Sequence, residues 1–163
     1  MPTTPDERSR HPKGVWLGVD VGTVRVGVAR SDPAGVLATP LVTLNRDADG
    51  RRDLIELADL VRAHGAVGIV VGDPVTLAGR AGQAAQQART YANELRQYVP
   101  ETSVVLLDER LTTVAATRTL SERGVRGRAR RAVVDQAAAV VLLQHWLDSR
   151  PAESRAAGEL PER

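Results

Sequence analysis

The order of the expected strands and helices is the feature of this sequence that most constrains its fold. Two valine-rich runs, "GVWLGVD" (residues 14–20) and "VRVGVARS" (24–31), are separated by a short turn at Val21–Thr23 and predict a β-hairpin. The run "GVLATPLVTL" (35–44) predicts a third strand, in which Pro40 favours an edge position or a bend because it lacks an amide proton. The chain is therefore expected to begin with a three-stranded antiparallel meander.

Helical and strand segments alternate after this meander. Apolar residues at helical spacing predict a helix over 53–64 that Gly65 ends, and the apolar run "AVGIVVGD" (66–73) predicts a strand buried on both faces. The remaining segments are expected to be a helix over 82–98, a second buried strand in "TSVVLLDER" (102–110), a helix over about 114–122, a basic loop over 124–131 and a helix in "AVVDQAAAVVLLQHWL" (132–147).

This order predicts an α/β fold of the ribonuclease-H-like type. Its mixed five-stranded sheet would contain the three-stranded antiparallel meander and two parallel strands, with helices on both faces. The same opening begins each half of the actin-like and sugar-kinase ATPases. Those proteins need two such domains around one nucleotide, and 163 residues provide only one.

The composition limits where the chain works and what chemistry it can use. We expect a flexible tail over 1–13, a folded domain over 14–149 and a second flexible tail over 150–163. No stretch approaches the roughly 18 apolar residues of a membrane helix, so a soluble cytoplasmic protein with no membrane partner is expected. The absence of cysteine excludes disulfides, thiolate metal sites and a cysteine nucleophile.

Carboxylates occur at three places where an apolar environment is expected. Asp20 follows an apolar strand, Asp108 and Glu109 end the last strand, and Asp135 lies in an apolar helix. Each has a structural alternative: turn amides for Asp20, a helix cap for the pair, and a salt bridge to Arg130 or Arg131 for Asp135. One divalent cation site would account for all three, because hard cations bind carboxylate oxygens. Asp108 and Glu109 alternate on a strand, so one of them at most is expected beside Asp20.

Arginine supplies nearly all of the positive charge. The chain has 22 lysine and arginine residues, and Lys13 is the only lysine. The run "RGVRGRARR" (123–131) precedes Asp135, and the glycine-bearing loop around Arg80 precedes a helix, so both segments are candidates for binding phosphate. Solvated surface charge is the alternative for both. Only two tryptophans, two tyrosines and no phenylalanine are present, which argues against binding single strands by stacking bases on aromatic rings.

Four blocks together resemble the YqgF/RuvX family, whose members are described as pre-16S rRNA nucleases related to Holliday junction resolvases. The blocks are "LGVDVGTVRVGVARSD", "VVGDPVTLAGRAGQAAQQAR", "LLDERLTTVAA" and "VDQAAAVVLLQHWLD", in the order and spacing of the family. The resemblance implies a metal-dependent endonuclease, with Mg2+ or Mn2+ as cofactor and structured RNA, branched DNA or a ribosomal precursor particle as partner. It implies Asp20, Glu109 and Asp135 as catalytic residues, and Asp20, Asp108, Glu109 and Asp135 as candidate metal ligands. The candidate nucleic-acid-binding residues are Arg25, Arg80, Arg110, Arg126, Arg128, Arg130 and Arg131.

One position departs from the family pattern. Asp73 stands where the family usually has leucine between glycine and proline, so it either adds a further carboxylate to the metal site or replaces an apolar contact with a charge. Three functions remain open at this point: cleavage of precursor 16S rRNA near its 5′ end, resolution of DNA junctions, and nucleic-acid binding without catalysis. The expected oligomeric state is a monomer or a weak homodimer.

Overall fold

The computed structural model describes residues 13–74, 82–114 and 127–150, which form a mixed five-stranded sheet covered by helices. The elements are β1 (Trp16–Val21), β2 (Arg25–Ser31), β3 (Ala38–Asn45), α1 (Arg52–His64), β4 (Gly68–Asp73), α2 (Gln83–Tyr98), β5 (Ser103–Asp108), the short 3-10 helix η1 (Glu109–Leu111) and α4 (Arg128–Ser149). The strand order is β3-β2-β1-β4-β5. The pairs β1–β2 and β2–β3 are antiparallel, and β1–β4 and β4–β5 are parallel, as the sequence predicts.

The two ends of the sheet differ from its centre in burial. β4, between β1 and β5, has all six residues buried, which confirms the strand expected from its apolar run. β5 was expected to be equally buried, and this is wrong: its six residues are only half-buried because it is an edge strand with one neighbour. At the other edge, Pro40 pairs with Ala29 next to a register shift in β3, as its missing amide proton requires.

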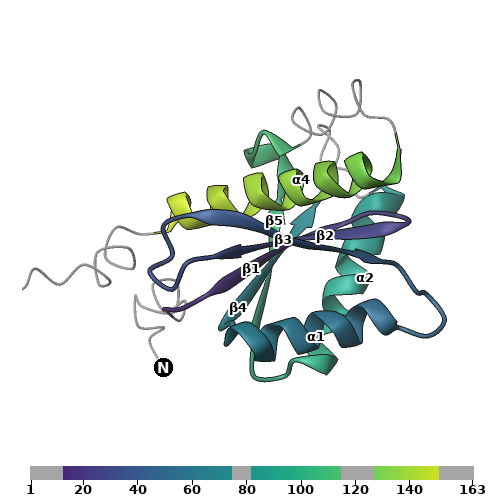
Figure 1. The fold of residues 1–163 in the computed structure, drawn as a ribbon, viewed down its shortest axis with the longest axis horizontal. Coiled ribbons are helices and arrows are strands. Elements are labelled where there is room, and N and C mark those ends of the chain that lie inside the picture. Colours follow the sequence, from purple (N-terminus) through teal and green to yellow (C-terminus); the bar gives the residue numbers. More distant parts are fainter. Residues whose placement is uncertain (1–12, 75–81, 115–126, 151–163) are drawn as a thin grey trace, which may run out of the picture.

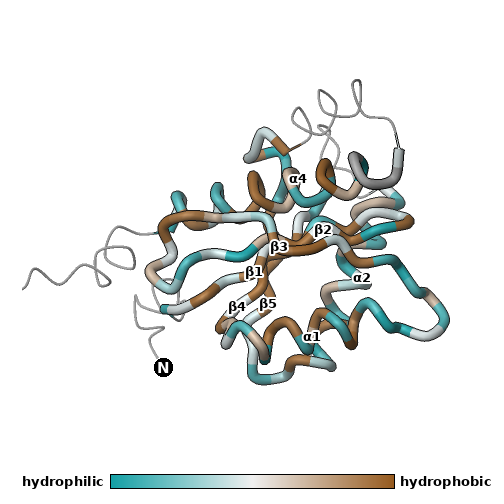
Figure 2. Tube along the Cα trace, viewed as in Figure 1, coloured by the Kyte–Doolittle hydropathy of each residue, from teal (hydrophilic) through white to brown (hydrophobic). Residues whose placement is uncertain are grey.

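Helices cover both faces of the sheet (Figure 1), and each face has its own apolar core. The α1 and α2 face is packed around Leu17, Val19, Ile69 and Val71. The α4 face is packed around Trp16, Val70, Leu142 and Leu143. Figure 2 shows the apolar stretches following the central strands and the inner sides of the helices. The central strands β1 and β4 contribute to both cores, so they carry apolar residues on both sides.

Helix boundaries follow the sequence except at the start of α4. Gly65 ends α1 with a φ of 60°, a left-handed conformation that glycine adopts without strain. α4 begins at Arg128, so the expected basic loop over 124–131 is wrong in its second half. Arginine and alanine have good helix propensities, so the helix can begin within the basic run. The helix expected over 114–122 lies outside the described residues, apart from Val114.

The far end of α4 is fixed by two contacts. The rings of Trp16 and Trp146 lie with their centroids 5.4 Å apart at an angle of 47°. Arg150, which the sequence placed in a flexible tail, is only 5% exposed, and its guanidinium donates a hydrogen bond to the carbonyl of Gly35. Arg150 therefore packs against the β2–β3 connection.

Within the part of the chain that the structure describes, no helix combines the length and apolar composition needed to cross a membrane.

Candidate active site

Strand alternation places Asp20 on the face of the sheet that α4 covers. Trp16 belongs to the core under α4, and Gly18 approaches Leu143 of α4, so the next residue on the same side of β1 is Asp20. Its carboxylate lies near the carboxyl end of β1, and Asp20 is only 6% exposed. A carboxylate in such a place needs hydrogen bonds or a cation to compensate for its lost hydration.

Glu109 reaches this same face of the sheet through a gap left by a glycine. In the β1–β4 register Val19 lies beside Val71, so Asp20 continues the row beside Gly72. A Cβ atom on Gly72 would lie 2.5 Å from Oε1 of Glu109, which means that the Glu109 carboxylate occupies the space a side chain would fill. Glu109 is only 6% exposed. The missing side chain at position 72 thus lets the Glu109 carboxylate lie over the strand next to Asp20.

Asp135 approaches from the other side of Asp20, again over a glycine. Asp20 pairs with Gly27 of β2, and a Cβ atom on Gly27 would clash with the backbone of Asp135 in α4. The carboxylate of Asp135 accepts a hydrogen bond from Nε of Arg25 at 2.8 Å, and both side chains are about one-quarter exposed. The sequence predicted a salt bridge to Arg130 or Arg131 as the structural alternative for Asp135; its described ion-pair partner is Arg25 of β2.

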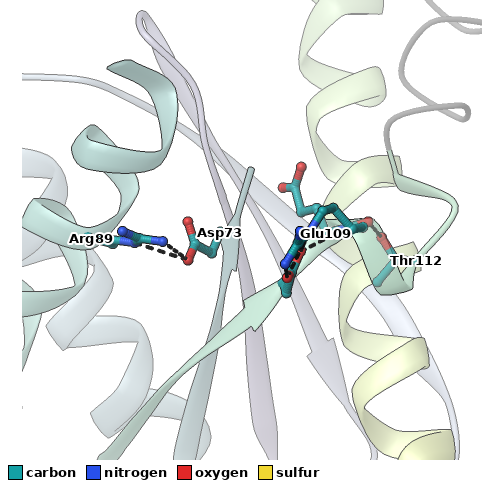
Figure 3. Close-up of polar contacts among 6 residues, drawn as sticks. Asp73, Arg89, Glu109 and Thr112 are labelled. Atoms are coloured by element: carbon teal, nitrogen blue, oxygen red, sulfur yellow. Dashed lines mark hydrogen bonds and ion pairs between the residues drawn. The ribbon is translucent and has the colours of Figure 1, made fainter. Parts of the chain in front are cut away.

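Asp73 and Asp108 project from the opposite face of the sheet, toward α2. They are paired in the β4–β5 register. Oδ2 of Asp73 accepts hydrogen bonds from Nε and Nη2 of Arg89 at 3.1 and 2.9 Å, and Asp108 accepts hydrogen bonds from the guanidinium and the backbone amide of Arg110. Figure 3 shows Asp73 directed at Arg89, with Glu109 outside this pair. The structure therefore does not bring Asp73 or Asp108 together with Asp20.

The two carboxylates of the "DER" segment differ in environment as well as in direction. Hydrogen bonds from the Arg110 guanidinium and amide lower the pKa of Asp108 below its usual value. Asp108 also caps η1, and the next residue, Glu109, turns into the 3-10 helix and is buried. Thr112 donates a hydrogen bond to the Glu109 carbonyl at 2.8 Å, which fixes the backbone at this turn. Glu109, rather than Asp108, is thus the acid that lies on the side of Asp20.

An open cleft of about 410 Å³ lies beside these carboxylates. Asp20, Asp135, Arg25 and Arg131 line it, together with the β1–β2 turn and the first turn of α2. Glu109 is buried behind Gly72 and does not line this cleft. Arginine and carboxylate groups therefore share one cavity, where a phosphate and a cation could bind side by side.

The donors around Asp20 fit a hard divalent cation in kind. All are carboxylate oxygens, and Gly72 leaves room for the Glu109 carboxylate beside Asp20. Among residues 13–74, 82–114 and 127–150, no three acidic or histidine side chains are grouped as a metal site requires, and Asp135 is held by Arg25. Asp20 and Glu109 are thus the candidate ligands that the fold brings together, with Asp135 next to them.

The candidate nucleic-acid-binding arginines do not all lie at the cleft. Arg25 and Arg131 line the cleft, whereas Arg110 is engaged with Asp108 on the other side of the sheet. Arg80 and Arg126 lie outside the described residues, and so do the side chains of Arg128 and Arg130.

Arg46 is a positioning residue that the sequence analysis missed. Its Nη1 donates a hydrogen bond to the carbonyl of Gly22 at 2.9 Å, and its amide bonds to the carbonyl of Val24. Its Nε lies 3.8 Å from Oδ2 of Asp53, which is only 2% exposed. Arg46 therefore ties the β1–β2 turn beside Asp20 to α1. The acid seven residues further on was the available signal, because Asp53 lies in the first turn of a helix with a leucine face.

Comparisons with known proteins agree with this architecture. The family described as "RuvX: Holliday junction resolvase" matches residues 14–149. A protein of Mycolicibacterium paratuberculosis named "Putative pre-16S rRNA nuclease" is 52% identical over 160 residues, which cover 98% of this chain and 95% of the relative. A protein of Nocardia farcinica with the same name is 48% identical over 160 residues, covering 95% and 89%.

Solved structures show the same fold at low identity. The structure titled "T. thermophilus RuvC in complex with Holliday junction substrate" has a TM-score of 0.53 and 14% identity, and the match covers 84% of this chain and 95% of that one. A second Thermus thermophilus RuvC structure has a TM-score of 0.52 and 12% identity, covering 83% and 95%. The ribonuclease-H-like fold expected from the sequence is therefore confirmed. Because the family matches residues 14–149, this chain belongs to the RuvX family.

Proposed function

We propose that this protein is a divalent-metal-dependent endonuclease that hydrolyses phosphodiester bonds near the 5′ end of precursor 16S rRNA. The observation that carries the proposal is the row Gly27–Asp20–Gly72 across the sheet, over which Asp135 and the Glu109 carboxylate lie on either side of Asp20. The choice of RNA is supported by the names of the relatives that are about half identical over nearly the whole chain.

Asp20 and Glu109 would hold the cation, Mg2+ or Mn2+, with Asp135 as a further ligand. The chemistry that such an ion supplies is stabilisation of the charge that develops on the attacking and leaving oxygens of a phosphodiester. Arg25 and Arg131 would bind the phosphate from the wall of the cleft. Asp135 is half-buried and in contact with Arg25, so a carboxylate for the cation and a guanidinium for the phosphate lie side by side. Asp73 and Asp108 would act by holding Arg89 and Arg110.

The experiment compares wild type with Asp20→Asn, Glu109→Gln and Asp135→Asn on a labelled 5′ fragment of precursor 16S rRNA, with Mn2+, with Mg2+ and with EDTA. We expect cleavage by the wild type that needs the metal. We expect each variant to lose at least about 100-fold in rate, because each removes a charged group on which the transition state depends. Circular dichroism checks that the variants remain folded.

Asp59→Asn is the matched control, because it removes a carboxylate from an exposed pair with Arg62 on α1. It should cleave as the wild type does. Cleavage by Asp20→Asn at the wild-type rate would contradict the proposal, and so would a wild type that cuts no nucleic acid with either metal. Binding without cleavage by the wild type would support a non-catalytic binding module instead.

Resolution of DNA junctions is the second candidate, because the description of the matching family names it. A labelled four-way junction is therefore assayed beside the RNA. Symmetric cleavage of two strands requires two active sites, so this function also predicts a dimer in light scattering. Faster cleavage of the junction than of the RNA by a dimer would favour the resolvase.

A further inference from the structure

A second hollow lies next to the cleft, between β2, β3 and the start of α4. Its lining residues, here called the β3 groove, are Val24, Arg25, Thr43, Asn45, Arg131 and Ala132, and its volume is about 570 Å³. Val24, Arg25 and Arg131 also line the cleft, so the two hollows are adjacent and meet at these residues. A nucleic-acid chain bound in the cleft can therefore continue past them into the β3 groove.

The two hollows differ in charge. Asp20 and Asp135 line the cleft, whereas the charged residues that line the β3 groove are Arg25 and Arg131. The groove therefore favours anions, and the cleft combines arginines with the acids that would hold a cation. This distribution suits a polyanion with one phosphate at the carboxylates and the following phosphates at the arginines.

The floor of the groove is fixed and presents a polar group to solvent. Thr43 donates a hydrogen bond to the carbonyl of Ala132 at 2.8 Å and accepts one from Nε2 of Gln136 at 3.0 Å, which fastens β3 to α4. Asn45 pairs with Arg25 in the β2–β3 register, is exposed, and makes no side-chain hydrogen bond to the described residues. Val24, at 63% exposed, adds an apolar surface at the rim.

We propose that the β3 groove binds the nucleotides next to the cut, on the same strand as the scissile phosphate. Their phosphates contact Arg25 and Arg131, the Asn45 amide bonds to a sugar or base edge, and Val24 supports a ring. The volume suits a nucleotide or two and not a double helix, since pockets of about 300–1,000 Å³ hold molecules of this size. The proposal rests on the proposed nuclease function, because that function places the scissile phosphate in the cleft.

The test measures the affinity of Asn45→Asp for a fluorescent single-stranded oligonucleotide that spans the cut site, in EDTA so that nothing is cleaved. The new carboxylate lies beside Arg25 and faces the path of the phosphates, so we expect binding about five- to tenfold weaker than wild type. The matched control is Asn93→Asp, which makes the same charge change at an exposed position of α2. Asn93→Asp should bind as the wild type does.

A cross-linking experiment with the wild-type protein tests the proposal without relying on the Asn45→Asp variant. The oligonucleotide carries a photoreactive 4-thiouridine one nucleotide from the cut, and the cross-linked peptide is identified by mass spectrometry. Cross-links to the segment 24–25 or 43–45 are expected.

Equal affinities for Asn45→Asp and Asn93→Asp, or cross-links confined to other segments, would overturn the groove proposal even if the wild type cleaves RNA. A wild type that cleaves neither substrate would overturn the nuclease function, and an affinity loss confined to Asn45→Asp would still place the strand in the groove.

Discussion

Nε of Arg25 lies 2.8 Å from Oδ2 of Asp135, so an arginine on β2 neutralises a carboxylate of the proposed metal site. The two residues are far apart in the sequence, and the pair joins β2 to the first half of α4. A cation that binds Asp135 must compete with this guanidinium, and a phosphate that binds Arg25 must compete with the carboxylate. Binding of cation and phosphate should therefore favour one another through this pair.

Arg25→Gln tests this competition. Without the guanidinium, Asp135 no longer has to leave a partner before it binds a cation, so we expect Mn2+ to bind about fivefold more tightly, equivalent to about 1 kcal/mol for a partly exposed pair. Oligonucleotide binding should weaken in the same variant. Electron paramagnetic resonance of free Mn2+ measures the first effect, with Arg62→Gln on α1 as the control. An unchanged Mn2+ affinity would show that Arg25 and the cation do not share Asp135.

Gly72→Ala should separate folding from activity. The added methyl group meets the flexible end of the Glu109 side chain, which can move aside, so we expect the free energy of unfolding to fall by only about 1 kcal/mol. The displaced carboxylate should lower the cleavage rate about 100-fold, since misplacement by about 1 Å has effects of this size. Urea unfolding and the cleavage assay measure the two quantities.

Gly27→Ala is the contrasting variant. Its methyl group would meet the backbone carbonyl of Asp135 in α4, which cannot rotate away. We expect a loss of about 3 kcal/mol or more in the free energy of unfolding, at the upper end of the effects of overpacking. A Gly27→Ala protein as stable as Gly72→Ala would show that α4 does not pack closely on β2.

Asp73→Leu introduces the residue that the family resemblance leads us to expect at this position. Asp73 is 8% exposed and its Oδ1 has no hydrogen-bond partner among the described residues, so the loss of the Arg89 pair is offset by the burial of an apolar side chain. We expect the free energy of unfolding to stay within about 1 kcal/mol of wild type and the cleavage rate to stay within about twofold. A 100-fold loss of rate would instead make Asp73 a metal ligand.

Arg89→Gln should be more harmful to stability than Asp73→Leu. It leaves the Asp73 carboxylate buried without its cation, and breaking a pair in this way costs about 3 kcal/mol when the remaining charge is buried. Urea unfolding of the two variants side by side checks the order. If Arg89→Gln lost no more free energy of unfolding than Asp73→Leu, the Asp73 carboxylate would have to be compensated by water or by a group other than Arg89.

The pKa of Asp108 should depend on Arg110. Hydrogen bonds from Arg110 lower the pKa of Asp108 in the folded state, so the stability it contributes is present above its unfolded pKa of about 3.9 and is lost as the pH falls through the lower folded value. In Arg110→Gln, the pKa of Asp108 should rise toward 3.9. An NMR titration of the aspartate carboxyl carbons measures this shift.

Asp32 provides an internal reference in the same titration. Burial raises the pKa of Asp32, but hydrogen bonds from the amides of Leu37 and Val36 lower it. The lowering outweighs the effect of burial, so the pKa is below its usual value. Arg110→Gln should leave the Asp32 titration unchanged. A shift of both residues together would point to a general loss of structure.

The succession of strands and helices along the chain could be predicted because it depends on local patterns. Gly65 ends α1 as expected, and the apolar run of β4 gives a strand buried on both faces. Burial of β5 could not be predicted in the same way, because its apolar run resembles that of β4. Only the order of the strands in the sheet distinguishes an edge from the centre.

The sequence predicts that the site is made of carboxylates, but it only partly predicts which carboxylates belong to it. Asp20 and Asp73 both lie at the carboxyl ends of central strands, and the flanking residues of both strands are apolar on either side. No alternation of polar and apolar residues therefore shows which face each acid occupies. The register of β1 with β4 places them on opposite faces, and register is a property of the whole sheet.

The contact between Trp16 and Trp146 gives the protein an optical reporter of its own. These are the only two tryptophans in the chain, so the tryptophan fluorescence comes entirely from the place where the end of α4 rests on the start of β1. Asp20 is four residues further along β1, roughly 13 Å away at the usual rise of a strand. Emission should thus follow the release of α4 from the sheet and remain insensitive to substitutions among the carboxylates.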